Sequence, residues 1–257
     1  MLVAELHFRI VADTSYAIAE TAIRSYLECL IFQGQILGRE FPTVLQQDIF
    51  ISRIVIPASD ALVGRHHSAR GLQALEKLES AGLSYPKLQI LGEDLMSNHT
   101  DPCSETSGYI LYCRFGLMNS VLYCQEHFAP VPLYRLPQTD QQDHEALIRW
   151  QLQYQALDEI QMQEQRVLPH TAERSLQQWQ SRLNQQGRRL AQQLSRQLSK
   201  PVFYALYSGS STDCSLEPTK RCPSCHSDWR LDAPWHQLFD FKCQDCQLVS
   251  NIAWECQ

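Results

Sequence analysis

An α+β fold is predicted for this chain, with an N-terminal α/β sheet domain, a long helical hairpin and a small cysteine-bearing C-terminal module. Three observations carry the prediction. Strand-like and helix-like stretches alternate through the first 135 residues, helical periodicity fills residues 139–199, and two Cys-x-x-Cys pairs follow near the C-terminus. The corresponding domains are residues 1–137, 138–200 and 201–257. A chain of 257 residues is long enough to give such domains real hydrophobic cores.

The sheet domain is predicted from two alternating periodicities. The stretches Leu2–Val11 and Asp48–Pro57 are apolar and rich in β-formers, whereas Ala17–Leu37 and Ser68–Ala81 repeat apolar residues at helical spacing. A short strand at Lys87–Leu91 completes a β-α-β-α-β order, which is typical of a small mixed sheet domain.

A β-hairpin is expected next, because two β-prone runs, Tyr109–Phe115 and Ser120–Glu126, are joined by four residues. Cys113 and Cys124 lie in these runs and could face each other across the hairpin as half of a metal site. Small buried thiols are common in strands, and we favour that interpretation for both.

Two long helices are predicted at Thr139–Gln165 and Thr171–Ser199, with Thr139 and Thr171 as N-caps. The short break at Leu168-Pro169-His170 indicates an antiparallel hairpin. Both helices carry a stripe of Trp and Leu, which we interpret as mutual packing. Gly187 stands where Leu or Ala would continue the stripe of the second helix.

The C-terminal region begins with a strand at Pro201–Tyr207 and a polar linker, and then presents two Cys-x-x-Cys pairs separated by seventeen residues. This spacing predicts a structural Zn²⁺ site in a zinc ribbon, because two tight turns can aim four thiolates at one tetrahedral ion. Redox-active pairs or plain buried thiols are the alternatives. The site has no open position, so zinc-based catalysis is not expected. The four predicted ligands are Cys222, Cys225, Cys243 and Cys246.

Ten cysteines are present in all, and those outside the ribbon show no disulfide-framework spacing. The start of the chain lacks the apolar core of a signal peptide, and no apolar run is long enough to span a membrane. A cytoplasmic protein with reduced thiols and no membrane contact is therefore expected. The six remaining cysteines are Cys29, Cys103, Cys113, Cys124, Cys214 and Cys256.

Charge is divided unevenly along the chain, whose formal net charge is −6. Residues 166–257 have 11 basic and 8 acidic side chains, so a polyanion-binding surface is expected in this part. The second predicted helix is basic and free of acids after Glu173, and its positions 182, 189 and 196 share one face. The alternative is neutralisation by the acidic N-terminal domain. The basic residues of the helix are Arg174, Arg182, Arg188, Arg189, Arg196 and Lys200; those of the ribbon are Lys220, Arg221, Arg230 and Lys242.

The segment Gly64–Arg70 places Arg65, His66, His67 and Arg70 around the start of a helix, where they could bind an anion. The paired histidines could also be part of a metal site or act as a general base. A solvated loop is the simpler interpretation. No phosphate loop, nucleophile elbow or HExxH motif occurs, and no catalytic residues are predicted, so enzymatic activity is uncertain and the less favoured class.

The stretch Phe239–Asn251, together with Cys222-Pro-Ser-Cys225 and Trp229, resembles a bacterial family of unknown function described as zinc-ribbon-containing and nucleic-acid-binding. The resemblance is specific at the ribbon and loose along the rest of the chain. It implies zinc ligation by the four ribbon cysteines. One departure is His226, where ribbons often have Gly after the first cysteine pair.

Two functions follow from these observations. The first is a zinc-ribbon protein that binds nucleic acid or a ribonucleoprotein, such as RNA, DNA or a ribosomal surface, through the basic residues named above. The second is a protein-interaction module in which the zinc only staples the C-terminus and a protein partner docks on the helices or the ribbon.

Overall fold

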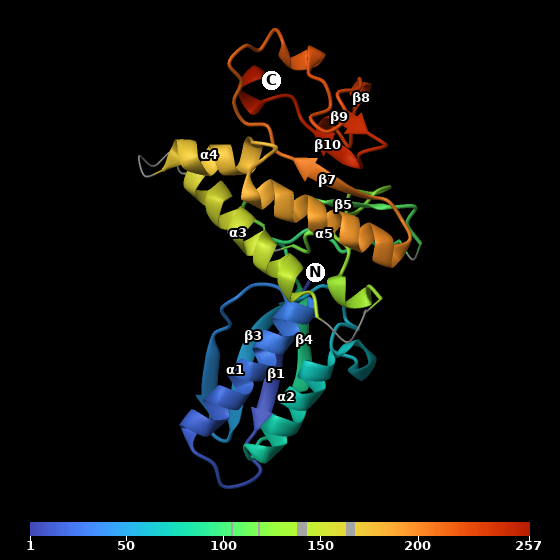
Figure 1. Cartoon of the computed structure of the whole chain (residues 1–257). Coiled ribbons are helices and arrows are strands. Elements are labelled where there is room, and N and C mark those ends of the chain that lie inside the picture. The colour runs from blue at the N-terminus through green and yellow to red at the C-terminus, as the bar shows by residue number, and fades with distance from the viewer. Residues whose placement is uncertain (104, 118, 138–142, 163–167) are drawn as a thin grey trace. The chain divides into compact units, whose positions relative to one another are not determined.

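The computed structural model describes residues 1–103, 105–117, 119–137, 143–162 and 168–257 (Figure 1). Its mixture of helices and sheets confirms the α+β class. The chain forms two compact units, and their limits differ from the three predicted ranges. The first unit contains Met1–Thr100, Leu117–Ser120 and Ala129–Glu145, and the second contains Asp101–Gly116, Val121–Phe128 and Ala146–Gln257.

The first unit is built on a four-stranded antiparallel sheet with the order β2-β3-β1-β4 (Figure 1). The chain order βαββαβ with β1 and β3 in the centre is the ferredoxin-like arrangement. The predicted strands and helices are all found, and β2 is an additional edge strand that joins β3 in a hairpin. The elements are β1 (Leu2–Arg9), α1 (Tyr16–Gln33), β2 (Thr43–Gln46), β3 (Ile49–Ile56), α2 (Ala69–Ser80) and β4 (Lys87–Glu93).

The core of this unit lies between one face of the sheet and the helices α1 and α2 (Figure 1). On β1, every second residue is fully buried, as with Leu6 and Phe8, because successive side chains of a strand point to opposite faces. Helix α1 begins where the Ser15 hydroxyl accepts a hydrogen bond from the Ile18 N–H, and it ends at Gly34 with a φ of 72°. These caps hold the apolar stripe of α1 against the sheet.

The second unit contains a six-stranded sheet with the order β6-β5-β7-β10-β9-β8. The predicted hairpin is confirmed as the antiparallel pair β5–β6, but its strands belong to this sheet and not to the first one. Strand β7 is the reason, because it pairs in parallel with β5 on one side and with β10 on the other. The strands are β5 (Tyr109–Leu111), β6 (Leu122–Cys124), β7 (Val202–Leu206), β8 (Arg230–Trp235), β9 (Phe239–Cys243) and β10 (Leu248–Ser250).

The helical segment contains α3 (Glu145–Met162), α4 (Pro169–Gln177) and α5 (Arg182–Leu198), so the predicted second long helix is in fact two helices. The break is fixed by Ser181, whose hydroxyl accepts the Asn184 N–H at 3.1 Å as an N-cap. The predicted cap Thr171 lies inside α4, and Thr139 falls outside the described residues. Across the described residues, no helix has both the length and the apolarity needed to cross a membrane.

Gly187 allows α5 to approach β7 closely. A Cβ atom at this position would lie 2.4 Å from Cε2 of Tyr204 and 2.8 Å from Cζ2 of Trp150. The indole N–H of Trp150 in α3 donates to the Leu183 carbonyl at 3.0 Å, which ties α3 to α5. The glycine in the apolar stripe is therefore explained by two buried aromatic rings that occupy the space of its missing side chain.

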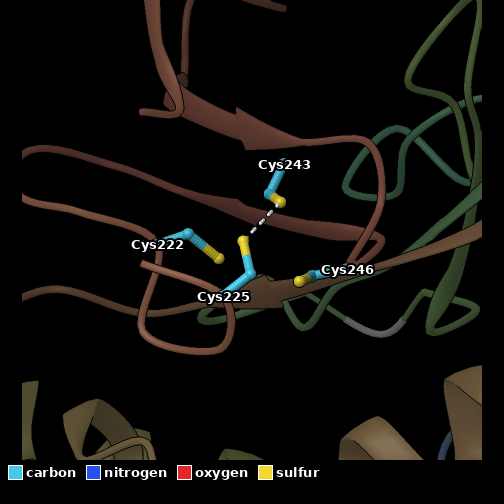
Figure 2. A group of neighbouring side chains, drawn as sticks. All are labelled: Cys222, Cys225, Cys243 and Cys246. Carbon is cyan, nitrogen blue, oxygen red and sulfur yellow. Dashed lines mark hydrogen bonds between the residues drawn. The ribbon is translucent and has the colours of Figure 1, made fainter. Parts of the chain in front are cut away.

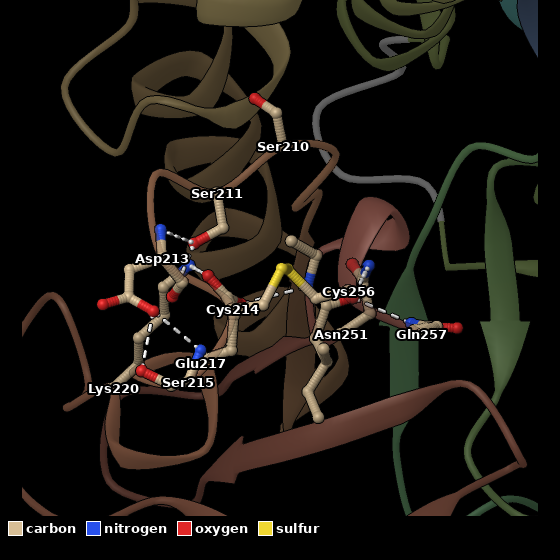
Figure 3. Close-up of a disulfide and its surroundings, with 12 residues drawn as sticks. Ser210, Ser211, Asp213, Cys214, Ser215, Glu217, Lys220, Asn251, Cys256 and Gln257 are labelled. Carbon is tan, nitrogen blue, oxygen red and sulfur yellow. Dashed lines mark hydrogen bonds and ion pairs between the residues drawn. A yellow bond between two sulfur atoms is a disulfide. The ribbon is translucent and has the colours of Figure 1, made fainter.

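A disulfide joins Cys214 to Cys256 and closes a loop with a sequence separation of 42 residues (Figure 3). The expectation of reduced thiols is therefore wrong for these two cysteines. Their Cα atoms are 5.3 Å apart, within the range that a disulfide can bridge. The spacing gave no sign of this, because the ends of the loop meet only when the C-terminal turn folds back. Nearby, the buried carboxylate of Glu217 accepts the Ala253 N–H at 3.0 Å.

Candidate metal centre and basic helix

Four cysteines of the second unit converge on one point (Figure 2). Cys243 is the last residue of β9, and Cys246 lies in the turn that leads to β10. Cys222 and Cys225 belong to the loop that precedes β8. All four sulfur atoms lie within 4.8 Å of one another, and the Sγ atoms of Cys225 and Cys243 are 3.6 Å apart. This cluster can bind a metal ion.

The backbone forms a tight turn around each cysteine pair. In the first turn the His226 N–H donates to the Cys222 carbonyl at 2.8 Å, and the Cys222 N–H donates to the Ser227 carbonyl at 3.0 Å. His226 adopts a left-handed φ of 60°, so it fills the role for which Gly is often used. Gln247, directly after the second pair, has a φ of 48°. Each cysteine pair is therefore followed by a residue in the left-handed conformation, which ends a tight turn.

Burial and hydrogen bonding shift the pKa values of three of the four thiols in different directions. Desolvation raises the pKa of the buried Cys243 thiol to about 12, and it also raises the pKa of Cys222. Cys225 is exposed, and hydrogen bonding to Ser227 lowers its pKa to about 6. A divalent cation would favour the thiolate form at each position. For tetrahedral zinc, with Zn–S bonds of about 2.3 Å, neighbouring sulfurs stand about 3.8 Å apart, which is close to the observed arrangement.

The two basic side chains that precede Cys222 form ion pairs with acidic side chains of the second unit. Lys220 forms an ion pair with Glu217, and Arg221 forms one with Asp228. Their role as free phosphate contacts is therefore weakened.

The two cations on the ribbon strands are engaged as well. The guanidinium of Arg230 lies 3.4 Å from Asp240 and faces the ring of Phe241. The ammonium of Lys242 lies 3.6 Å from the ring centre of Trp235, and burial lowers its pKa. Both side chains contribute to the packing of the ribbon.

The arginine ridge, which we define as Arg182, Arg189 and Arg196, lies along one exposed face of α5. Among the described residues of the second unit, none of the three forms an ion pair with a carboxylate. Positions seven residues apart are separated by about 10 Å along a helix axis, so the ridge presents three charges in a row.

The other cations of the helical segment are placed differently. Arg174 at the end of α4 is exposed, whereas Lys200 is half-buried. Arg188 stacks its guanidinium 3.3 Å from the ring centre of Trp179 and donates to the Trp179 carbonyl at 3.0 Å. Arg188 therefore holds the turn between α4 and α5, whereas the exposed Arg174 donates through Nε to the His170 carbonyl at 3.1 Å on its own helix.

The two histidines that precede α2 are packed into the first unit, so the expected solvated loop is wrong for them. The buried ring of His67 is hydrogen-bonded through Nε2 to the Tyr26 hydroxyl at 2.9 Å, and burial lowers its pKa. His66 packs edge-on against Tyr134 and lies 3.6 Å from an oxygen of Asp60. These contacts account for both side chains as structural residues.

A residue that the sequence patterns did not reveal is Asp158 on α3. It lines a cavity of about 380 Å³ together with Tyr112, Tyr154, Phe239 and other side chains of the second unit. Burial, together with the negative charge of the neighbouring Glu159, raises the pKa of its carboxyl group to about 6. Its position in the stripe between Tyr154 and Met162 was the available signal, because a charged residue there faces the core side of the helix.

Nearly the whole length of the chain matches a known protein. A Haemophilus influenzae protein described as uncharacterized is 31% identical over 261 residues, and the match covers 99% of both chains. The chain belongs to the same family as this protein. A second uncharacterized protein of Haemophilus influenzae is 32% identical over 173 residues, which are 67% of this chain and 85% of that protein. No solved structure matches the chain.

Three family models match successive segments, and each is described as a domain of unknown function: DUF8589 over residues 1–92, DUF2310 over residues 103–207 and DUF8594 over residues 212–256. The limits of these three segments coincide approximately with structural elements. The first covers the four-stranded sheet, the second covers the hairpin through β7, and the third is nearly the loop that the disulfide closes. None of these descriptions names a metal or a ligand, and the resemblance to a zinc-ribbon family is not confirmed by them.

Proposed function

We propose that the chain is a nucleic-acid-binding protein whose C-terminal cysteine cluster holds a structural Zn²⁺ ion and whose arginine ridge contacts the phosphate backbone. The observation that carries the metal proposal is the convergence of four cysteine sulfurs, supplied by two similar turns, within 4.8 Å. Four thiolates without a water position suit Zn²⁺ in a structural role. The ion would fix the loop before β8 to the β9–β10 turn.

The nucleic-acid proposal rests on the exposed ridge. Its three arginines stand on one face of a helix that contains no acidic residue, and they form no ion pair with a described carboxylate of the second unit. Exposed guanidinium groups without a carboxylate partner can bind phosphates and release condensed counterions, which gives binding without sequence preference. RNA, DNA or a ribosomal surface would offer such phosphates. These partners are cytoplasmic, and the proposal places the protein there.

The proposal is tested by replacing Arg182, Arg189 and Arg196 with alanine and measuring fluorescence anisotropy with labelled single-stranded RNA and duplex DNA over a salt series. If each arginine neutralises one phosphate, the slope of log K against log salt falls by about 2 to 3. A control removes three exposed cations of the first unit, Arg24, Arg39 and Lys87, and so changes the net charge equally. The control should bind like the parent.

Equal binding by the ridge variant and the parent would overturn the nucleic-acid proposal and favour the protein-interaction alternative. An equal loss in both triple variants would show that net charge, and not the ridge, governs association.

A further inference from the structure

A second cluster of metal-ligand side chains lies in the second unit, at Asp101, Cys103, Cys124 and His127. One ligand atom from each lies within 4.8 Å of the others. The Sγ of Cys124 is 3.7 Å from Nδ1 of His127, and that nitrogen is 2.9 Å from an oxygen of Asp101. Thiolate, imidazole and carboxylate are all ligands of protein-bound zinc.

The backbone around Cys124 repeats the turn of the ribbon. The Phe128 N–H donates to the Cys124 carbonyl at 3.0 Å, as the His226 N–H donates to the Cys222 carbonyl at 2.8 Å. Phe128 has a left-handed φ of 52°, close to the 60° of His226. The sequence Cys-Gln-Glu-His places His127 where the second cysteine of a ribbon pair stands.

The strands repeat the relation as well. Cys124 is the last residue of β6, just as Cys243 is the last residue of β9. In both cases the last residue of a strand contributes a buried sulfur, and the turn that follows contains the second ligand. The six-stranded sheet thus has one such turn after β6 and another after β9.

Burial and charge suit a cation at this second cluster. The Cys124 side chain is fully buried and Asp101 is only 4% exposed, while His127 is half-exposed and Cys103 is partly exposed. A carboxylate oxygen of Glu126 lies 3.1 Å from the Cys124 sulfur and adds negative charge beside the cluster. Binding would replace the proton that joins Asp101 and His127 with the metal ion and release the thiol protons.

The same residues do not form a nucleophilic catalytic set. In such a set the nucleophile and the carboxylate bond opposite nitrogens of the histidine. Here Cys124 and Asp101 both approach Nδ1 of His127, and the sulfur is closed to solvent. The side chains of Asp101, Cys124 and His127 instead surround a common point, as the ligands of a metal ion do.

We propose that Asp101, Cys103, Cys124 and His127 form a second zinc site, with a mixed two-sulfur donor set, that joins the segment before β5 to the turn after β6. Mixed sulfur, nitrogen and oxygen ligands favour Zn²⁺ over the oxygen-binding cations. Neighbouring ligand atoms around tetrahedral zinc stand about 3.3 to 3.8 Å apart, so the cluster needs only small side-chain movements to close on the ion.

The test counts metal in the full chain after reconstitution with Zn²⁺ in reductant and removal of unbound ions. The parent should hold two zinc ions, and His127→Gln and Cys103→Ser should each hold one. His170→Gln is the matched control, because His170 is an exposed histidine of the second unit that is outside both clusters, and it should keep two. In each site variant, the zinc ion that remains in the ribbon shows that the second unit is folded.

Substitution with Co²⁺ gives an independent readout. The parent should show two sets of visible d–d bands, one from a four-sulfur site and one from the mixed site, and His127→Gln should lose only the second set. A single zinc ion that the parent, His127→Gln and Cys103→Ser all retain, or two ions in all three proteins, would overturn the second site. These results leave the ribbon proposal untouched, because that depends on Cys225 and Cys246 and is tested with their own variants.

Discussion

The buried carboxyl group of Asp158 makes the stability of the second unit depend on pH in an unusual direction. Most native carboxylates are stabilised in the charged form, but Asp158 is packed among aromatic rings and receives no hydrogen bond from the described residues. Burial raises its pKa from 3.8 to about 6. The folded protein therefore binds this proton more tightly than the unfolded chain does.

The sign follows from proton linkage. Between about pH 4 and pH 6 the folded state holds more protons at Asp158, so this group's contribution to the free energy of unfolding falls as the pH rises. The decrease begins near the unfolded pKa and is complete above the folded one. The difference between 3.8 and about 6 corresponds to at most about 3 kcal/mol, and partial access to solvent reduces this value.

Asp158→Asn removes the titration and keeps the shape of the side chain. Urea unfolding should show the variant and the parent to be nearly equal at pH 4, and the variant to be more stable by about 1 to 3 kcal/mol at pH 7.5. Asp232→Asn, at an exposed position of β8, is the control and should change stability by less than about 0.5 kcal/mol at either pH. A difference between Asp158→Asn and the parent that is the same at both pH values would refute the reasoning.

Two substitutions test what stabilises the second unit, namely the close packing at Gly187 and the disulfide of Cys256. Gly187→Ala inserts a methyl group against Tyr204 and Trp150 and should lower the free energy of unfolding by about 1 to 3 kcal/mol, as measured by chemical denaturation; an unchanged or higher value would contradict the close approach of α5 and β7. Cys256→Ser opens the loop with a separation of 42 residues, which in the chain-entropy model costs about 4 kcal/mol. The parent and Cys256→Ser should differ in stability without reductant and converge with it, and no difference without reductant would show that Cys214 and Cys256 are thiols in the isolated protein.

The elements that the sequence predicted well are those whose signal is local. Strand β1, helix α2 and the turns of the two Cys-x-x-Cys pairs were each predicted from residues within one short segment. The edge strand β2 was missed because its four residues are all exposed and show no apolar alternation. The break between α4 and α5 was missed because it depends on Asn184, whose amide donates to two carbonyls of the preceding turn.

The assignments that sequence reasoning could not reach depend on contacts between distant segments. The hairpin β5–β6 was grouped with the first sheet because of its place in the chain, and only the parallel pairing with β7 assigns it to the second sheet. Asp101 and His127 are 26 residues apart, and nothing in their spacing shows that the folded chain brings them into contact. Cys124 was interpreted as a strand thiol for the same reason, although the Cys-x-x-His spacing from 124 to 127 was a local signal that could have been weighed.

The central claim is that the ribbon cysteines hold a zinc ion, and native mass spectrometry of the full chain tests it most directly. The mass of the parent should be compared with that of the double variant Cys225→Ser/Cys246→Ser, whose altered sulfurs are the more exposed members of the cluster. The account predicts that the variant carries one zinc ion fewer than the parent. An equal number of zinc ions in the two proteins would contradict it.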